Sequence, residues 1–303
     1  MHDNPAAAQA PAFALPAYRV VALSGRDAVA FAQAQFMNDV AALAPGRWQW
    51  NGWLTPKGRV IALFALLRIE DDTLWLLHAD ADAADFVARL RRFVFRSKVA
   101  IDVRDDLLVS AAFDAPHVAR DADVARLDDG RVEVDLGGDG GARVAWIAQP
   151  TQADVPDDAD AVLRWTRADL AHGLPHLVGQ EEQWTPQQLS LERLRAYSVK
   201  KGCYPGQEIV ARTHFLGHGK RGLVLLGSQR APSPGSSVEQ SGRPTGTIVS
   251  SVAVEGAARR DEGPEPPPPA LALAVLPLER DDAPMRAEGQ ELRVLALREG
   301  LAR

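Results

Sequence analysis

The spacing of apolar residues along the first part of the chain predicts short strands mixed with amphipathic helices. Residues 26–40 carry apolar side chains at intervals of three and four, which indicates a helix that opens near Asp27. Two apolar runs, 59–69 and 73–79, flank a short polar turn, a pattern typical of an antiparallel hairpin. The same patterns predict further strands at 18–23, 98–105, 107–113, 131–137 and 143–148, and helices at 85–96, at 161–173, after the capping pair Thr185-Pro186, and at 207–215.

The pattern changes after residue 220. Short apolar segments at 221–227, 245–254, 271–278 and 290–297 alternate with turns rich in glycine, proline and serine, which predicts a small antiparallel β-barrel. The proline-rich segment 259–269 inside this region has too few apolar residues to add to a core. We therefore expect an α+β region over residues 1–218 and a C-terminal barrel over residues 219–303.

The charge of the chain bears on whether nucleic acid is its binding partner. The chain has 303 residues, with 34 Lys and Arg against 40 Asp and Glu, a net charge of −6. This acidic balance argues against a protein whose main task is to bind nucleic-acid phosphates. Residues 89–99 are the one basic stretch, in which helical spacing would put Arg89, Arg92 and Arg96 on one face. A solvated helix face is the favoured interpretation, and contact with RNA or another anion is the alternative.

The sequence predicts a cytoplasmic protein without a membrane partner. The first 16 residues lack the basic start and apolar run of a secretory signal. No stretch approaches the ~18 apolar residues that a membrane span requires. A single cysteine excludes an internal disulfide, which is typical of a reducing compartment.

That cysteine, Cys203, lies in the segment SVKKGCYPGQE, residues 198–208. Gly202 and Gly206 permit backbone angles closed to other residues, and Pro205 stiffens the turn between them. Beside lysines and a helix N-terminus, the thiolate form of Cys203 would be favoured, and Glu208 would fall in the first turn of that helix. A buried cysteine with a purely structural role is the alternative. Close-spaced His and Cys ligands are lacking, so we expect no stable metal site in this chain.

The string KKGCYPGQEIVART resembles the signature K-G-C-Y-x-G-Q-E of the YgfZ family, folate-binding proteins that support iron–sulfur enzymes. Other segments resemble the family in the same order along nearly the whole chain, among them LSGRDAVAFAQAQFMNDVAAL, TPKGRVIALFALLR, HGLPHL and LGHGKRGL. The resemblance implies a functional role for the signature residues Lys201, Gly202, Cys203, Tyr204, Gly206, Gln207 and Glu208.

The family is similar in fold to the T-protein of the glycine cleavage system, an aminomethyltransferase that uses tetrahydrofolate. This implies an α+β fold of three subdomains in a ring around a central folate-sized hole, with a C-terminal β-barrel. The T-protein has an aspartate just after the glycine of the block that matches KGRVIALF, where this chain has Ile61, Ala62 and Leu63. The resemblance does not extend to that carboxylate, so it leaves enzymatic turnover open.

The resemblance also implies a set of folate-binding residues. Tyr18 and Trp165 match two aromatic positions assigned to folate in the family, which often has tryptophan at the first. Asn38-Asp39 matches the block that faces the hole, and two arginines are candidate partners for the glutamate tail of folate. For both aromatic residues, packing in the core is the alternative. The candidate folate residues are Tyr18, Trp165, Asn38, Asp39, Arg167 and Arg212.

Three hypotheses follow for the function. The first is a folate-dependent accessory factor that helps to make or repair iron–sulfur clusters, especially in radical enzymes that modify tRNA. Its cofactor would be tetrahydrofolate or a derivative, its transient partners iron–sulfur enzymes or cluster carriers, and its link to tRNA indirect. The second is a tetrahydrofolate-dependent one-carbon transferase or demethylase, and the third is direct RNA binding through residues 89–98.

Overall fold

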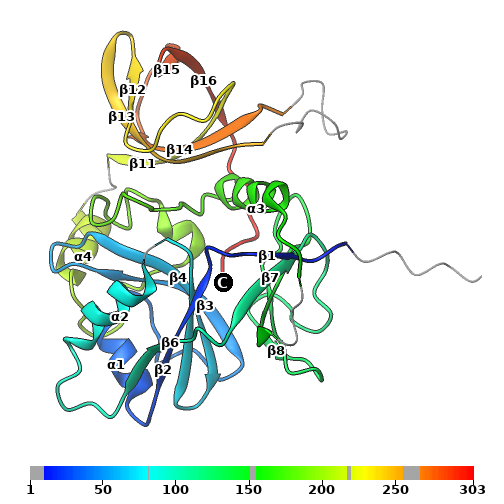
Figure 1. The fold of residues 1–303 in the computed structure, drawn as a ribbon. Helices are drawn as coiled ribbons and strands as arrows, with labels where there is room; N and C mark the ends of the chain where they lie inside the picture. Colours follow the sequence, from blue (N-terminus) through cyan, green and yellow to red (C-terminus); the bar gives the residue numbers. More distant parts are fainter. Residues whose placement is uncertain (1–9, 81, 151–154, 217–219, 255–266) are drawn as a thin grey trace, which may run out of the picture.

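The protein is described by a computed structural model over residues 10–80, 82–150, 155–216, 220–254 and 267–303. Over these residues the strands form two five-stranded sheets and a closed six-stranded barrel (Figure 1). The predicted α+β class and the predicted C-terminal antiparallel barrel are therefore confirmed.

The first sheet holds the predicted hairpin at its centre. Its antiparallel strands run in the order β3 (Arg47–Leu54), β4 (Val60–Glu70), β5 (Thr73–His78), β2 (Arg19–Ser24) and β6 (Ala100–Val103). Alternate residues of each strand point to opposite faces, so the sheet contributes to two separate cores.

Helices α1 (Ala28–Gln35) and α2 (Ala83–Arg91) cover one face of this sheet. Phe31 of α1 and Phe86 of α2 are buried there, in one cluster with Leu66 of β4. The other face belongs to the largest core of the molecule, which it shares with the second sheet and the barrel.

The second sheet runs in the order β1 (Phe13–Ala14), β7 (Leu108–Ala112), β10 (Val144–Ala148), β9 (Val132–Asp135) and β8 (Val124–Arg126). All of its neighbouring strands are antiparallel.

Helix α3 (Ala159–Ala171) lies between the second sheet and the barrel (Figure 1), where it contacts β1, β13 and β14. The barrel closes in the order β11 (Arg221–Ser228), β14 (Ala270–Pro277), β13 (Arg243–Ala253), β12 (Ser237–Gln240), β15 (Met285–Ala287) and β16 (Gln290–Leu295).

The chain leaves the barrel after β16 and returns to the centre of the molecule, where the C-terminus lies (Figure 1). The backbone N–H of Arg298 donates to the carbonyl of Ala171 at 2.8 Å. The indole N–H of Trp50, on β3, donates to the carbonyl of Leu301 at 2.8 Å. The last residues thus connect the barrel to α3 and to the first sheet. The predicted division at residue 218 stays a prediction.

Three predicted helices differ from the structure. The helix expected over 26–40 stops at Gln35, because Phe36 takes an extended conformation and pairs with Trp53. The helix expected to run to residue 96 ends at Arg91, whose guanidinium donates a hydrogen bond to the carbonyl of Ile101 in β6. No α-helix begins at Pro186; between it and α4 (Gln207–Leu216) the described chain forms turns and the 3₁₀ helix η2 (Leu191–Leu194).

Because α2 ends at Arg91, the prediction that three arginines share one helical face is wrong. Arg92 caps the helix and Arg96 lies beyond it, so the two do not share a helical face with Arg89. The guanidinium of Arg89 pairs with Glu182 at 2.5 Å and lies over the ring of Trp53. Across the part of the chain that is described, no helix has the length and apolar character needed to cross a membrane.

Candidate functional site

Cys203 is exposed, on the loop that leads into helix α4 (Gln207–Leu216). The alternative of a buried, structural cysteine is therefore wrong. The predicted helix after the loop is confirmed, and Glu208 lies in its first turn. The thiol is presented to solvent beside the N-terminus of α4.

The loop that carries Cys203 is anchored by the buried side chain of Lys201. Its ammonium donates to the backbone carbonyls of Gln33 at 2.5 Å, Phe36 at 2.5 Å and Asn38 at 3.1 Å. These bonds use all three N–H donors of the ammonium, so none is left for the thiol. Burial lowers the pKa of Lys201 to about 8, an effect that the carboxylate of Asp39 partly opposes. Lys201 therefore holds the loop in place.

Tyr204 and Gln207 complete this anchor. The phenol of Tyr204 donates to the carbonyl of Ser198 at 3.2 Å, and its buried ring lies 4.8 Å from the ammonium of Lys201. The side-chain amide of Gln207 donates to the carbonyl of Lys201 at 3.1 Å. Most of the signature thus builds a rigid support under one exposed thiol.

The two glycines of the signature have different roles. Gly206 has a φ of +80°, and a Cβ there would lie 2.6 Å from the carbonyl oxygen of Thr55 and 2.7 Å from the Cα of Gly58. Gly206 therefore meets both the close approach and the backbone angle that require glycine. Gly202 is outside the left-handed region, and a Cβ there would meet nothing within 4 Å. The prediction that the conformation of the loop requires Gly202 is wrong.

Asn38 and Asp39 belong to the same support. The side-chain amide of Asn38 donates to the carbonyls of Trp50 at 2.9 Å and Arg195 at 2.7 Å. The carboxylate of Asp39 accepts a hydrogen bond from Gln33 at 3.0 Å. Arg212 is exposed on α4, the helix that follows the Cys203 loop. The structure thus brings three candidate folate residues to the cysteine loop and its support.

Tyr18 and Trp165 lie together in a different place. The indole N–H of Trp165 donates to the hydroxyl oxygen of Tyr18 at 3.3 Å, and that hydroxyl donates to Asp169 at 3.2 Å. Trp165 is only 1% exposed, and its ring packs against Phe13 in the core. The two predicted aromatic positions are neighbours, as a shared site requires, but Trp165 is closed to solvent and Tyr18 is only partly exposed.

Charged groups that were not predicted from the sequence surround this pair. Asp169 accepts hydrogen bonds from Arg143 at 2.7 Å and from His176 at 3.3 Å, and His176 contacts Asp80 at 3.1 Å on its other nitrogen. His176 lies in the segment HGLPHL, which the family resemblance had already marked. Asp80 and Arg143 come from distant loops, so only the fold brings them to Asp169.

The ionisation states in this buried network are set by pairing. Burial alone would lower the pKa of His176, but Asp80 and Asp169 outweigh it and raise the pKa to about 10. Burial alone would raise the pKa of Asp169, but Arg143 and His176 hold it below its ordinary value. Burial and the charge of Asp169 raise the pKa of Tyr18 well above its ordinary range. At neutral pH two carboxylates therefore face two cations.

A small cavity borders the network, with Tyr18, Trp50, Asp80 and His176 in its wall. Its volume is about 30 Å³, whereas sites for drug-sized ligands span roughly 300–1,000 Å³. A folate cannot enter here unless the network opens. The role of Tyr18 and Trp165 in folate binding stays a prediction.

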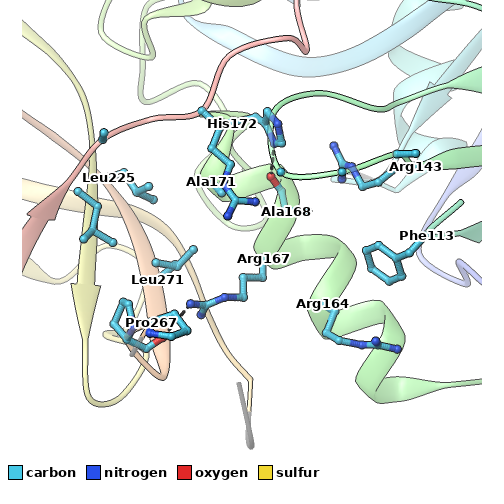
Figure 2. A pocket seen from close by; sticks show the side chains of 17 residues that line it. Phe113, Arg143, Arg164, Arg167, Ala168, Ala171, His172, Leu225, Pro267 and Leu271 are labelled. Carbon is cyan, nitrogen blue, oxygen red and sulfur yellow. Dashed lines mark hydrogen bonds between the residues drawn. The ribbon is translucent and has the colours of Figure 1, made fainter. Parts of the chain in front are cut away.

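A much larger cleft of about 670 Å³ lies between α3, the barrel and the C-terminal segment (Figure 2). Arg167, the remaining candidate folate residue, projects into it from α3 and donates to the carbonyl of Pro268 at 2.8 Å. The candidate folate residues therefore fall into separate places: the support of the cysteine loop, the buried network and this cleft. Among the residues that the structure describes, no group of three or more His, Cys, Asp or Glu is arranged to hold a metal ion.

Known proteins are similar to this chain over most of its length. No protein-family model matches the chain. An uncharacterized protein of Haemophilus influenzae is 28% identical over 255 residues, which cover 80% of this chain and 84% of that protein. The tRNA-modifying protein YgfZ of Aliivibrio fischeri strain MJ11 is 28% identical over 286 residues, 88% of this chain and 84% of that protein. The YgfZ protein of Cronobacter sakazakii is 27% identical over 78% of this chain and 79% of that protein.

Among solved structures, the glycine cleavage system aminomethyltransferase T of Bartonella henselae matches with a TM-score of 0.69. The match covers 95% of this chain and 86% of that chain. At 13% identity this similarity shows the fold alone. The chain is thus related over most of its length to the YgfZ proteins, as its cysteine motif predicted, and is built on the fold of the glycine cleavage aminomethyltransferase.

Proposed function

We propose that this protein is a folate-binding accessory factor for the assembly or repair of iron–sulfur clusters in a subset of enzymes, including radical enzymes that modify tRNA. It acts in the cytoplasm and contacts iron–sulfur enzymes or cluster carriers transiently. The name of its relatives, tRNA-modifying protein, supports the link to tRNA. The net charge of −6 supports an indirect link, through the enzymes rather than through RNA itself.

The observation that carries the proposal is the exposed thiol of Cys203 on an anchored loop. A buried lysine, a buried tyrosine and a glycine in close backbone contact fix the loop, yet the side chain at its tip packs against nothing that would explain a structural role. A fixed thiol is suited to meet a cluster or a sulfur atom on a partner, because little conformational entropy is lost when the two proteins dock.

Tetrahydrofolate or a derivative is the proposed cofactor. The support is the fold, which is that of an aminomethyltransferase of the glycine cleavage system. The buried Tyr18–Trp165 pair provides aromatic surface for a pterin ring once the adjoining network opens. The proposal assigns no stable metal site to this chain.

A one-carbon transferase or demethylase is the second candidate. Ile61, Ala62 and Leu63 are buried in β4, so this part of the strand offers no carboxylate to activate a folate. Asp80 lines the small cavity and Asp169 lies behind it in the same network, but each is paired with a cation. Turnover of a methylated or aminomethyl donor would favour this candidate over the accessory factor.

The test is genetic rescue in a bacterial host that lacks its own homologue. Wild type should restore the activity of iron–sulfur enzymes and the thiolated tRNA bases that they make, whereas Cys203→Ser should not. Lys200→Met is a matched control in the same loop, because Lys200 is exposed and lies outside the residues to which the signature gives a role. Full rescue by Cys203→Ser at wild-type protein levels would overturn the proposed role of the thiol.

A further inference from the structure

The large cleft beside α3 has a composition unlike the rest of the chain. Its volume of about 670 Å³ lies within the range of sites for small organic molecules. Cationic side chains enter it from α3, from the segment before β10 and from the C-terminal segment (Figure 2). They are Arg143, Arg164, Arg167 and Arg298, with His172 beside them.

Arg143 is paired with Asp169, which lies outside the cleft, but no carboxylate among the described residues that line the cleft balances Arg164, Arg167 and Arg298. Burial lowers the pKa of Arg167, and the charge of Arg298 lowers it further. Burial likewise lowers the pKa of His172, with Arg143 and Arg298 adding to the effect. The cations are therefore close enough to repel one another. Arg164, Arg167 and Arg298 thus form a local excess of positive charge in a chain with a net charge of −6.

Two buried polar atoms of the lining residues also lack partners. Arg143 is 3% exposed and bonds Leu136 and Asp169, but its second terminal nitrogen has no hydrogen-bond partner. His172 is 3% exposed and contacts the carbonyl of Ala168 through Nδ1, which leaves Nε2 without one. Buried polar atoms are normally satisfied, so these are places where a bound molecule can act as the partner.

The rest of the wall is apolar and fixed. The rings and side chains of Phe113, Leu225, Leu271 and Leu295 line the cleft, and Arg164 lies 5.1 Å from the ring centre of Phe113. A Cβ at Gly140 would overlap the guanidinium of Arg298, so glycine at this position makes room for that side chain. The cleft thus offers spread positive charge beside an apolar surface.

We propose that this cleft binds an organic polyanion, a molecule that carries several carboxylate or phosphate groups on a ring-bearing or apolar body. The spacing of the cations over several elements favours more than one negative group. The site does not include Cys203, and it adjoins the Tyr18–Trp165 pair through Arg143, whose guanidinium lies 4.7 Å from the ring centre of Trp165. The inference goes beyond the proposed function, which needs a folate but does not place one in this cleft.

Two sources of such an anion are distinguished by direct binding measurements on the purified full chain. Isothermal titration calorimetry is run with a pentaglutamylated folate, with ATP in the absence of metal ions, and with adenosine as an uncharged comparison. We expect at least one of the two polyanions to bind and adenosine not to bind. The preferred polyanion identifies the source. If neither polyanion binds, the proposal is wrong.

Variants then locate the binding. Arg298→Gln and Arg167→Gln should each weaken the bound polyanion at least about tenfold, the scale of a lost charged hydrogen bond, and Arg298→Glu should abolish binding. Arg286→Gln, at an exposed arginine of β15 outside the cleft, is the matched control. Polyanion affinity unchanged in a folded Arg298→Glu protein would overturn the proposal. Cys203→Ser should bind as wild type does, so this result is independent of the rescue assay.

Discussion

Gly206 of the cysteine signature lies directly against Gly58 of the turn that precedes β4. A Cβ on Gly206 would come within 2.7 Å of the Cα of Gly58, and a Cβ on Gly58 would lie 2.8 Å from the Cβ of Ile209. Two segments about 150 residues apart in sequence therefore meet backbone to backbone. This contact fixes where α4 begins, and with it the position of Cys203.

Gly206→Ala should destabilise the protein by more than about 2 kcal/mol. The substitution adds the left-handed backbone cost of about 1–2 kcal/mol to a clash with backbone atoms that cannot rotate away. Urea denaturation followed by circular dichroism measures the effect. Gly202→Ala, four residues earlier in the same loop, should change stability by less than about 0.5 kcal/mol. Equal effects of the two substitutions would contradict the geometry.

Lys201→Met should destabilise the protein by about 1–3 kcal/mol, because the carbonyls of Gln33, Phe36 and Asn38 lose their shared donor in a buried place. It should also fail in genetic rescue, although Cys203 remains. The matched control is Lys200→Met, since Lys200 is exposed. A Lys201→Met protein that is as stable as wild type would show that the ammonium does not anchor the loop.

Local signals were enough to predict much of the fold. The hairpin of β4 and β5 was readable because its two apolar runs flank a polar turn, and α3 because Gly173 and Pro175 end its apolar pattern. Strand β3 was missed because Asn51 and Gly52 interrupt it, and both are buried by contacts with the loop around Asn38 that no local pattern records.

The site was only partly predictable for the same reason. The signature located the exposed thiol, but the partners of Lys201 lie more than 160 residues away in sequence. The position of Lys201 beside Cys203 predicted a charge that favours the thiolate, and it did not predict that the ammonium binds distant backbone carbonyls. The Asp80–His176–Asp169 network was not predicted, because Asp80 lies far in sequence from the segment that holds Asp169 and His176.

Trp165→Phe should weaken folate binding by about 1 kcal/mol, the scale of a reduced aromatic contact. Calorimetry with tetrahydrofolate measures the change in Kd. Trp48→Phe is the matched control, because Trp48 is also fully buried in the same core. Both variants should lose similar stability, but only Trp165→Phe should lose affinity. Equal affinity in the two folded variants would remove Trp165 from the folate site.

Cys203 should react with iodoacetamide in the native protein, to one label per chain, because its side chain is exposed and it is the single cysteine. Mass spectrometry counts the labels. The labelled protein should keep the melting temperature of wild type, since the loop is held from its buried side. Labelling that requires urea would contradict the exposure of the thiol.

Stability should fall as the pH rises from about 6.5 toward 10, because the pKa of His176 is raised to about 10 in the folded protein. A histidine in the unfolded chain loses its proton near pH 6.5. The stabilisation is therefore complete below about pH 6.5 and is lost as the pH rises through the folded pKa. One such proton changes the free energy of unfolding by at most about 1.4 kcal/mol per pH unit.

Lys201 limits the pH window in which this effect can be read. Its folded pKa of about 8 lies below that of an unfolded lysine, so above pH 8 it adds stability as the pH rises. Urea denaturation of wild type and His176→Gln should therefore be compared between about pH 6.5 and 8. The variant should be less stable at pH 6.5, and the difference should shrink toward pH 8, because other titrations cancel between the two proteins. A difference that stays constant across this window would show that His176 does not hold its proton between Asp80 and Asp169.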